Sequence, residues 1–335
     1  MKILLVQTSF LGDTILSTPV IKGLHTLYPD ARIWMMTTPL SSSLVKRDPI
    51  LSGVISYDKR GKESGVSGLI RMSRRIKKMR FDKVYSLHRS FRTSFLVWLT
   101  GIPERTGCDD AGLSFVYNTR TKRDFSTHDV IRNLSILSKE AKLETFDSDM
   151  RLFAPPRDEI SRRLVGRLPE KGTYAVLVPG SVWKTKMWKW QGFRSVAEFL
   201  LSKDIPVVLL GASSDKRVCS SVSKGLPIAD VSGETTISEA MYIMKHAKLS
   251  VCNDSMSLHM SSAFKIPTVA VFCATSPEFG YGPWKNNSVV VEKTGLHCKP
   301  CRPHGSNTCP TGTEACMNDL SPDNVINAVT SIVEL

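Results

Sequence analysis

Three short polar segments hold the residues whose types could do chemistry, and each comes directly after an apolar run typical of a buried strand. The first contains Gly12-Asp13, the second runs from Ser181 to Lys186, and the third runs from Asp254 to His259. In open α/β sheets, ligands bind where the strands end and the next helices begin. We therefore predict that these three segments form the functional site.

Asp13 gives the first segment a single carboxylate at the start of a helix. Such a group can take a proton from a substrate as a general base, or it can simply cap the helix. No G-x-G-x-x-G sequence follows the first strand, so a dehydrogenase-type dinucleotide site is disfavoured. The residues alone leave both roles of Asp13 open.

The other two segments are suited to an anionic ligand. A Gly/Ser turn at Ser181 with Lys184 and Lys186 nearby can hold phosphates through backbone N–H groups, a hydroxyl and ammonium charge, although an exposed basic turn is the alternative. It is not a Walker A loop. A helix beginning near Ser255 directs its free N–H groups at an anion. His259, one turn further, is either a ligand-binding or a core histidine.

Two groups could hold a metal ion. Cys298, Cys301, Cys309 and Cys316 could bind zinc, but the last pair lacks C-x2-C spacing, so reduced thiols or an adventitious disulfide are alternatives. Asp147-Ser148-Asp149 matches the DxD of metal-dependent transferases. Because it lies in a polar stretch before a linker, we expect no metal there.

Apolar β-type runs alternate with helical stretches along the chain, which predicts an α/β fold with parallel sheets covered by helices on both faces. A Pro-rich, charged segment interrupts this alternation at 156–172 and predicts a linker between domains 1–155 and 173–320. Ser321-Pro322-Asp323 predicts a final helix within 321–335. The predicted strands are Ile3–Val6, Arg32–Met36, Lys83–Ser86, Tyr174–Val178, Pro206–Leu210, Leu249–Cys252 and Thr268–Phe272.

The composition is that of a folded protein with a basic N-terminal half. The 335 residues suit two domains, and 41% hydrophobic with 23% charged residues excludes a disordered chain. Of the net charge of +14, residues 1–155 carry +10. The N-terminal domain should therefore face an anionic partner.

Much of this charge lies between Lys59 and Arg92, where twelve basic residues accompany two acidic ones. Leu69, Met72, Ile76 and Met79 have helical spacing there, which predicts a basic amphipathic helix. A solvated surface helix, anionic lipid, a phosphorylated glycan or nucleic acid would fit the charge. Because the sequence has no helix-turn-helix or aromatic RNA-binding signature, we expect no nucleic-acid partner.

The first apolar run, before Gln7, is too short for a signal peptide or a membrane span. We therefore expect a cytoplasmic protein, with the eight cysteines as thiols or metal ligands rather than a disulfide framework.

Taken together, several motifs resemble those of glycosyltransferase family 9, and within it the heptosyltransferases of the lipopolysaccharide inner core. The resemblance spans nearly the whole chain. Its motifs are Gly12-Asp13 with Thr18-Pro19, Ile102-Pro103-Glu104-Arg105-Thr106-Gly107, Lys186 before Trp188, Asn253-Asp254-Ser255, Thr275-Ser276-Pro277, and the tail with Cys298, Pro300-Cys301, Cys309-Pro310 and Cys316-Met317.

The resemblance implies a GT-B fold, in which two Rossmann-like, doubly wound parallel-sheet domains face a cleft. The acceptor would bind mainly to the N-terminal domain, and ADP-heptose to the C-terminal one. Asp13 takes the position of the general base, and Ser181 and Lys186 take those that hold the donor phosphates. The other matched positions at the donor site are Asp215, facing the ribose, and Asp254, Ser255, Met256 and His259.

Met256 stands where the family has glycine. A methionine adds bulk and loses access to positive φ, so the donor could sit differently or be another nucleotide sugar. On the acceptor side we expect basic residues of the N-terminal domain to bind an anionic glycan. They are Lys59, Arg60, Lys62, His88, Arg89 and Arg92.

The resemblance implies an inverting transfer from ADP-L-glycero-D-manno-heptose to the lipopolysaccharide core, by a protein that can lie peripherally on the inner membrane. Lys186, the Ser181 hydroxyl and the helix start at Ser255 would stabilise the leaving diphosphate. We therefore expect no required cofactor or divalent metal. Alternatives are a family 9 transferase with another nucleotide sugar or acceptor, and a GT-B nucleotide-sugar epimerase.

Overall fold

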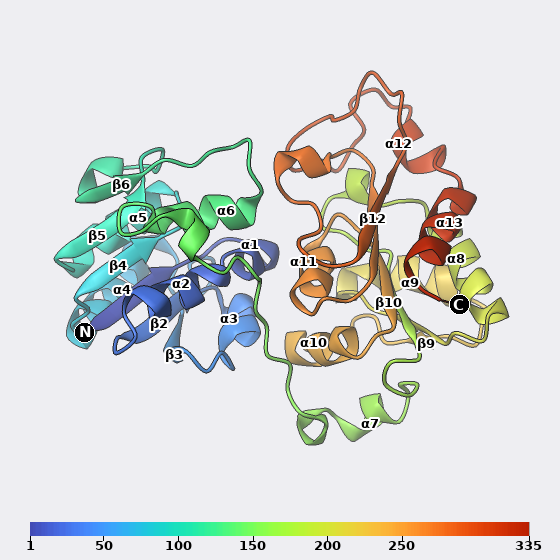
Figure 1. Cartoon of the computed structure of the whole chain (residues 1–335), viewed down its shortest axis with the longest axis horizontal. Helices are drawn as coiled ribbons and strands as arrows, with labels where there is room; N and C mark the ends of the chain where they lie inside the picture. Colours follow the sequence, from blue (N-terminus) through green and yellow to red (C-terminus); the bar gives the residue numbers. More distant parts are fainter. Residues whose placement is uncertain (335) are drawn as a thin grey trace. The chain divides into compact units, whose positions relative to one another are not determined.

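Two six-stranded parallel sheets form the framework of the chain, of which the computed structural model describes residues 1–334. The chain divides into two compact units, one from Met1 to Phe153 and one from Ala154 onward. In Figure 1 the N-terminal unit runs from blue to green and the C-terminal unit from green to red. The α/β fold predicted from the alternating pattern is confirmed.

The N-terminal sheet has the strand order β3-β2-β1-β4-β5-β6, the order of doubly wound dinucleotide-binding folds. Its strands are β1 (Lys2–Val6), β2 (Arg32–Thr37), β3 (Leu51–Ser56), β4 (Lys83–Ser86), β5 (Glu104–Cys108) and β6 (Thr119–Thr121). Its helices are α1 (Leu11–Leu16), α2 (Pro19–Leu27), α3 (Pro39–Val45), α4 (Gly65–Met79), α5 (Phe91–Thr100) and α6 (Asp129–Leu134), with 3-10 turns η1 (Ser114–Val116), η2 (Ser135–Leu137) and η3 (Leu143–Thr145).

The C-terminal sheet repeats this plan in the order β12-β11-β10-β7-β8-β9. Its strands are β7 (Ala175–Val178), β8 (Val207–Leu209), β9 (Ala229–Asp230), β10 (Leu249–Asn253), β11 (Thr268–Phe272) and β12 (Ser288–Glu292). Its helices are α7 (Arg162–Val165), α8 (Trp190–Ser202), α9 (Lys216–Ser223), α10 (Ile237–Lys245), α11 (Met256–Ala263), α12 (Ala315–Asn318) and α13 (Pro322–Ile332), with 3-10 turns η4 (Arg157–Glu159), η5 (Lys184–Lys186), η6 (Ser213–Asp215) and η7 (Pro277–Phe279).

Each sheet has one point at which the strand order reverses. In the N-terminal unit it lies between β1 and β4, and in the C-terminal unit between β7 and β10. The loops that leave two adjacent strands there diverge to opposite faces of the sheet, which opens a crevice at the carboxyl ends. The three polar segments of the sequence follow β1, β7 and β10.

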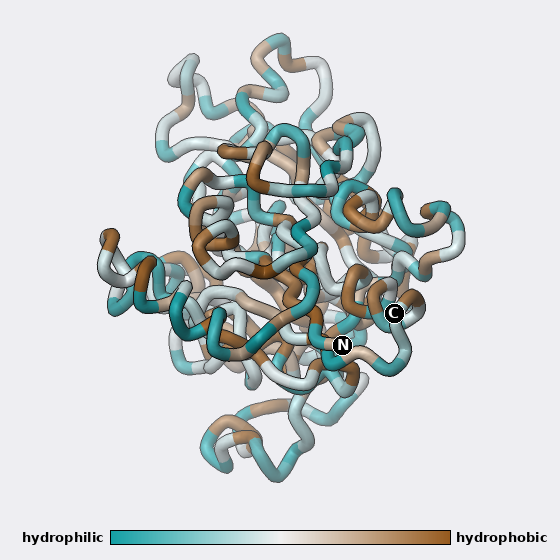
Figure 2. The backbone as a smooth tube through the Cα atoms, turned by 90° about the vertical axis from the view of Figure 1, so that its left-hand side faces the viewer, coloured by the Kyte–Doolittle hydropathy of each residue, from teal (hydrophilic) through white to brown (hydrophobic). Residues whose placement is uncertain are grey.

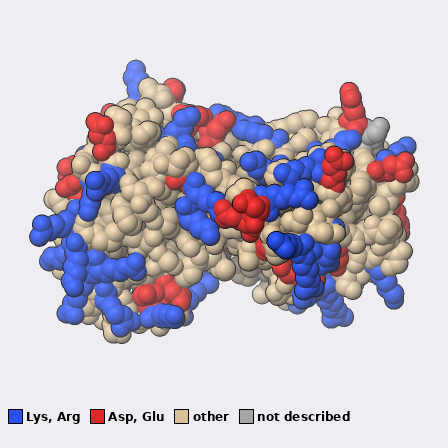
Figure 3. Space-filling model, turned by 90° about the horizontal axis from the view of Figure 1, so that it is seen from below, with Lys and Arg blue, Asp and Glu red and all other residues tan. Residues whose placement is uncertain are grey.

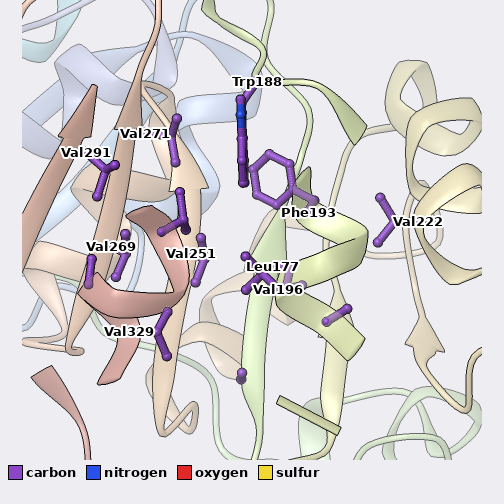
Figure 4. Packing of buried hydrophobic residues seen from close by; sticks show 14 of the residues in the cluster. Leu177, Trp188, Phe193, Val196, Val222, Val251, Val269, Val271, Val291 and Val329 are labelled. Carbon is purple, nitrogen blue, oxygen red and sulfur yellow. The ribbon is translucent and has the colours of Figure 1, made fainter. Parts of the chain in front are cut away.

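Buried aliphatic and aromatic side chains hold each unit together. Figure 4 shows the C-terminal core, where the indole of Trp188 packs beside Phe193 with a ring-centroid distance of 5.3 Å. The Trp188 Nε1–H donates to Leu320 O at 3.2 Å, so its one polar atom is satisfied. Viewed from the side of the N-terminal unit, hydrophobic segments lie mainly inside and hydrophilic ones in the outer loops (Figure 2).

The segment 156–172, which we predicted as a linker, is ordered against the C-terminal unit. Arg163 and Arg167 of this segment both form ion pairs with Glu234, at 3.1 and 2.7 Å. At the other end of the unit, Ser321 caps α13 by accepting the Asp323 N–H at 3.3 Å, as predicted. α13 packs on α8, β11 and β12.

Candidate active site

Lys186, Asp254 and Thr275 meet in the C-terminal unit. The Lys186 Nζ lies 2.6 Å from Asp254 Oδ2, and the Thr275 hydroxyl donates to the same oxygen at 2.7 Å. Asp254 and Thr275 are buried, whereas Lys186 keeps some exposure. A lysine held in this way is already ordered before a ligand arrives, which lowers the entropic cost of binding an anion.

Asn253 holds the loop that carries Lys186 next to the loop that carries Asp254. Its side-chain amide donates to Pro179 O at 2.8 Å and accepts the Trp188 N–H at 3.0 Å. Asn253 is completely buried. Because Pro179 and Trp188 flank the loop of Lys186, the amide holds both ends of that loop against the end of β10.

Asp215 lies directly against the turn of Ser181. A Cβ placed on Gly180 would be only 2.3 Å from Asp215 Cγ, so this close approach requires glycine. The Asp215 carboxylate also accepts the Ala212 N–H at 2.9 Å. The structure thus brings Asp215 next to the Gly/Ser turn.

The start of α11 supplies a buried hydroxyl. Ser255 precedes the first helical residue, and among residues 1–334 its buried Oγ has no hydrogen-bond partner. Met256 begins the helix and is not among the residues with positive φ. The backbone at Met256 therefore needs no positive φ in this chain, and the effect of the methionine on the donor stays a prediction. His259 is buried one turn further along.

A cysteine-bearing loop is fastened to the Lys186 turn. The backbone N–H of Thr185 donates to Ser306 O at 3.0 Å, and its hydroxyl accepts the Ser306 N–H at 2.8 Å. A Cβ on Gly305, which has φ +73°, would lie 3.0 Å from Lys186 Cγ. This clasp was not predicted, because the two segments are 121 residues apart.

The four cysteines of this loop were the candidates for a zinc site. Within the described part of the chain, no group of three or more His, Cys, Asp or Glu side chains is placed to hold a metal ion. Burial raises the pKa of Cys316 to about 11, whereas a hydrogen bond with Thr311 lowers the pKa of the half-buried Cys309 to about 7. The zinc alternative therefore has no geometric support.

In the N-terminal unit, Asp13 lies in the first turn of α1 and not at its N-cap, which is Phe10. Its carboxylate accepts the Phe10 N–H at 3.1 Å. The guanidinium of Arg60 lies over the Phe10 ring, 6.0 Å from its centroid. The structure therefore brings one predicted acceptor residue, Arg60, close to the turn that holds Asp13.

Lys59 and His88 also meet, at the end of β4. The Lys59 Nζ is 3.5 Å from His88 Nε2, and the other ring nitrogen of His88 is 3.1 Å from the Thr8 hydroxyl. Burial and the nearby charges of Lys59 and Arg89 lower the pKa of His88 to about 4. His88 is therefore neutral at pH 7 and can offer a ligand a hydrogen bond but no charge.

The remaining basic residues have different surroundings. Arg92 donates to Tyr57 Oη at 2.8 Å and to Glu63 O at 2.7 Å, so it braces the loop after β3. Arg89 forms an ion pair with Asp110. Lys62 is exposed in the same loop. In the DxD-like sequence, Asp147 pairs with Lys22 at 2.5 Å.

The fold defines a class: two doubly wound, Rossmann-like units, each built on a six-stranded parallel sheet, are the GT-B architecture. The model of glycosyltransferase family 9 (heptosyltransferase) matches residues 69–310. The chain belongs to this family and is a glycosyltransferase.

Relatives and a solved structure agree with the family match. The chain is 26% identical over 296 residues to lipopolysaccharide heptosyltransferase 3 of Escherichia coli K12, covering 83% of this chain and 84% of the relative. It is 24% identical over 343 residues to lipooligosaccharide heptosyltransferase 2 of Campylobacter jejuni, covering 100% and 99%. The structure of E. coli ADP-heptose LPS heptosyltransferase II superposes with a TM-score of 0.79 at 21% identity, covering 99% of this chain and 98% of that one.

Proposed function

We propose that the protein is an inverting, heptosyltransferase II-like enzyme that transfers heptose from ADP-L-glycero-D-manno-heptose to the inner core of lipopolysaccharide. The observation that carries this proposal is the cluster of Lys186, Asp254 and Thr275 at the strand ends of a family 9 chain. The relatives, which are lipopolysaccharide and lipooligosaccharide heptosyltransferases, support the sugar and the acceptor class. The finer part of the proposal is which heptose the enzyme adds, and we propose the second one.

On this proposal the C-terminal unit binds the donor. The Lys186 ammonium and the hydroxyls of Ser181 and Ser255 contact the diphosphate, together with the first N–H groups of α11. Asp215 accepts hydrogen bonds from the ribose. Met256 and His259 border the sugar from α11.

The N-terminal unit binds the acceptor and supplies the base. Asp13 removes the proton of an acceptor hydroxyl as that oxygen attacks the anomeric carbon, and ADP leaves from the opposite face. The negative charge that develops on the diphosphate is stabilised by groups already in place, which need no reorganisation during the reaction. An anionic core glycan would be held by Lys59, Arg60, Lys62, His88, Arg89 and Arg92.

The proposed location is the cytoplasmic face of the inner membrane, as a peripheral protein. Within residues 1–334, no helix is both long and apolar enough to cross a bilayer. The basic N-terminal unit would be the part that attracts an anionic surface. We propose no nucleic-acid partner for the protein.

The function is tested by incubating the protein with defined core glycolipids and a panel of ADP-, UDP- and GDP-sugars, with products read by mass spectrometry. We expect one heptose to be added from ADP-heptose and little transfer from the others. Efficient transfer from another donor would replace the proposed sugar. Isomerisation of a nucleotide sugar without any acceptor would instead favour the epimerase, which can share this fold.

The same assay tests the proposed independence from divalent metal. We expect turnover in EDTA to stay within about two-fold of the untreated rate, because Lys186 and the start of α11 provide the stabilising charge and dipole. Loss of turnover in EDTA that magnesium or manganese restores would contradict this. Unrelated loss through unfolding is detected by a thermal melt of the chelated protein.

A further inference from the structure

The basic segment between Lys59 and Arg92 separates into two regions in the structure. The loop with Lys59, Arg60 and Lys62 follows β3 and lies near His88 and Phe10. The outer face of α4 is a second basic region with different neighbours. Figure 3 shows basic side chains gathered along the N-terminal unit, on the left.

α4 is amphipathic, and its outer face carries unneutralised charge. Leu69, Met72 and Ile76 are buried as predicted, while the cations between them are exposed. The helix contains no acidic residue, and within residues 1–334 none of its outer cations except Arg71, which donates to Lys62 O, has a hydrogen-bond or ion-pair partner. The exposed outer face of α4 carries Ser67, Ile70, Arg71, Arg74, Arg75 and Lys78 side by side.

An exposed aromatic row lies on the neighbouring helix. Phe91, Phe95 and Trp98 are spaced four and three residues apart on α5, and their rings stack at centroid distances of 6.2 and 5.8 Å. Phe91 is 61% exposed and Trp98 53%. Phe115 of η1, which packs against α5, is 74% exposed. Large aromatic side chains in this number are unusual on a surface that contacts only water.

Because α4 packs against α5 and α5 against η1, the cations and the aromatic rings share one side of the N-terminal sheet. We infer that this α4/α5 surface docks on an anionic lipid bilayer. The cations of α4 contact lipid phosphates, and the rings of Phe91, Trp98 and Phe115 enter the interfacial layer. Aromatic side chains favour that layer, and each basic residue near an anionic membrane adds attraction.

Charge complementarity selects the bilayer over a second copy of this chain, whose own α4 would bring like charges together. The inference rests on the proposed function in one respect, which is that the acceptor is a glycolipid. α5 begins at Phe91, three residues after His88. A glycolipid head group in the docked membrane would therefore emerge beside the residues proposed to bind it.

The test uses vesicles of phosphatidylcholine, alone or with phosphatidylglycerol, and measures binding of the full chain by co-sedimentation. A charge variant replaces Arg74, Arg75, Lys77 and Lys78 by Gln, and an aromatic variant replaces Phe91 and Trp98 by Ser. A matched control removes the same charge from exposed positions of the C-terminal unit. It replaces Lys203, Arg217, Lys224 and Lys245 by Gln.

We expect the wild type to bind the anionic vesicles much more tightly than neutral ones. The charge variant should lose at least ten-fold in binding at low salt, where screening is weakest. The aromatic variant should lose binding at low and high salt alike, and the control should bind like the wild type. Equal loss in the control, or unchanged binding in both variants, would overturn the docking surface.

Activity separates this inference from the proposed function. The two docking variants should keep near-normal turnover on a deacylated, soluble acceptor but fall several-fold on the same acceptor anchored in vesicles. Equal loss on both acceptors would show that the surface binds the glycan itself and would reject docking. If the wild type transferred no heptose to either acceptor, the proposed function would fail while the vesicle result still decided docking.

Discussion

Asp13→Asn should lower kcat by roughly 10²–10⁴, the range for loss of a general base. An asparagine side-chain oxygen can still accept the Phe10 N–H that Asp13 accepts now, so the start of α1 should remain intact. It cannot take a proton from the acceptor hydroxyl. The measurement is steady-state turnover with ADP-heptose and a core acceptor, accompanied by calorimetry with ADP, whose affinity should hardly change.

Glu239→Gln is the matched control for this change. Glu239 is the third residue after the N-cap of α10, as Asp13 is in α1, and it accepts the N–H of the N-cap residue Thr236 at 2.9 Å. It belongs to neither proposed binding region. Its variant should retain wild-type turnover. A folded Asp13→Asn protein with turnover within a few-fold of the wild type would leave Asp13 only its capping role, and the proposed mechanism would fall with it.

Lys186→Ala should weaken donor use by about 10- to 150-fold in kcat/KM, since a hydrogen bond to a charged group contributes about 1.5–3 kcal/mol. The acceptor KM should change little. The substitution also leaves Asp254 buried with only the Thr275 hydroxyl beside it, so the protein should lose stability. Kinetics with varied donor and a thermal melt measure the two effects separately.

Two further variants distinguish loss of phosphate binding from loss of folding. Lys186→Ala combined with Asp254→Asn removes the buried charge, so stability should recover while donor use stays impaired. Lys184→Ala removes an exposed lysine of the same turn and should have little effect. Normal donor kinetics in Lys186→Ala, with a deficit in Lys184→Ala, would place the phosphates at Lys184 instead.

The predicted strands are those buried on both faces. Lys83–Ser86 and Thr268–Phe272 were predicted with the bounds that the structure shows, and the other five differ by one residue at either end. The strands that we missed are β3, β5, β6, β9 and β12, and the first four carry weaker patterns, whereas β12 reads Ser-Val-Val-Val-Glu. β5 reads Glu-Arg-Thr-Gly-Cys, β9 has two residues, and β3 contains Gly53, which the ring of Trp34 covers. Such weak strands form because a neighbouring strand offers hydrogen-bond partners. The residues of the strand itself do not indicate that this neighbour is present.

The site residues that could be predicted are those that come directly after a predicted strand in the sequence. Asp13, Lys186 and Asp254 could be found in this way, and the pairing of the last two could not. Thr275 directly precedes Ser276-Pro277 after β11, so its position at a strand end was the available signal. The bracing by Asn253 and the clasp between Thr185 and Ser306 depend on long-range packing, which a single sequence does not reveal.

Because the strand order is repeated in two units, such enzymes can change one unit at a time as they diversify. Each unit has its own hydrophobic core and its own reversal point, so the loops of one sheet can change without disturbing the packing beneath the other. The loop of Lys59 and His88 belong to the N-terminal unit, and the pair of Lys186 and Asp254 belongs to the C-terminal unit. Under the proposed assignment of acceptor and donor, a lineage can therefore acquire a new acceptor by altering one half of the chain while the other half preserves an inherited donor.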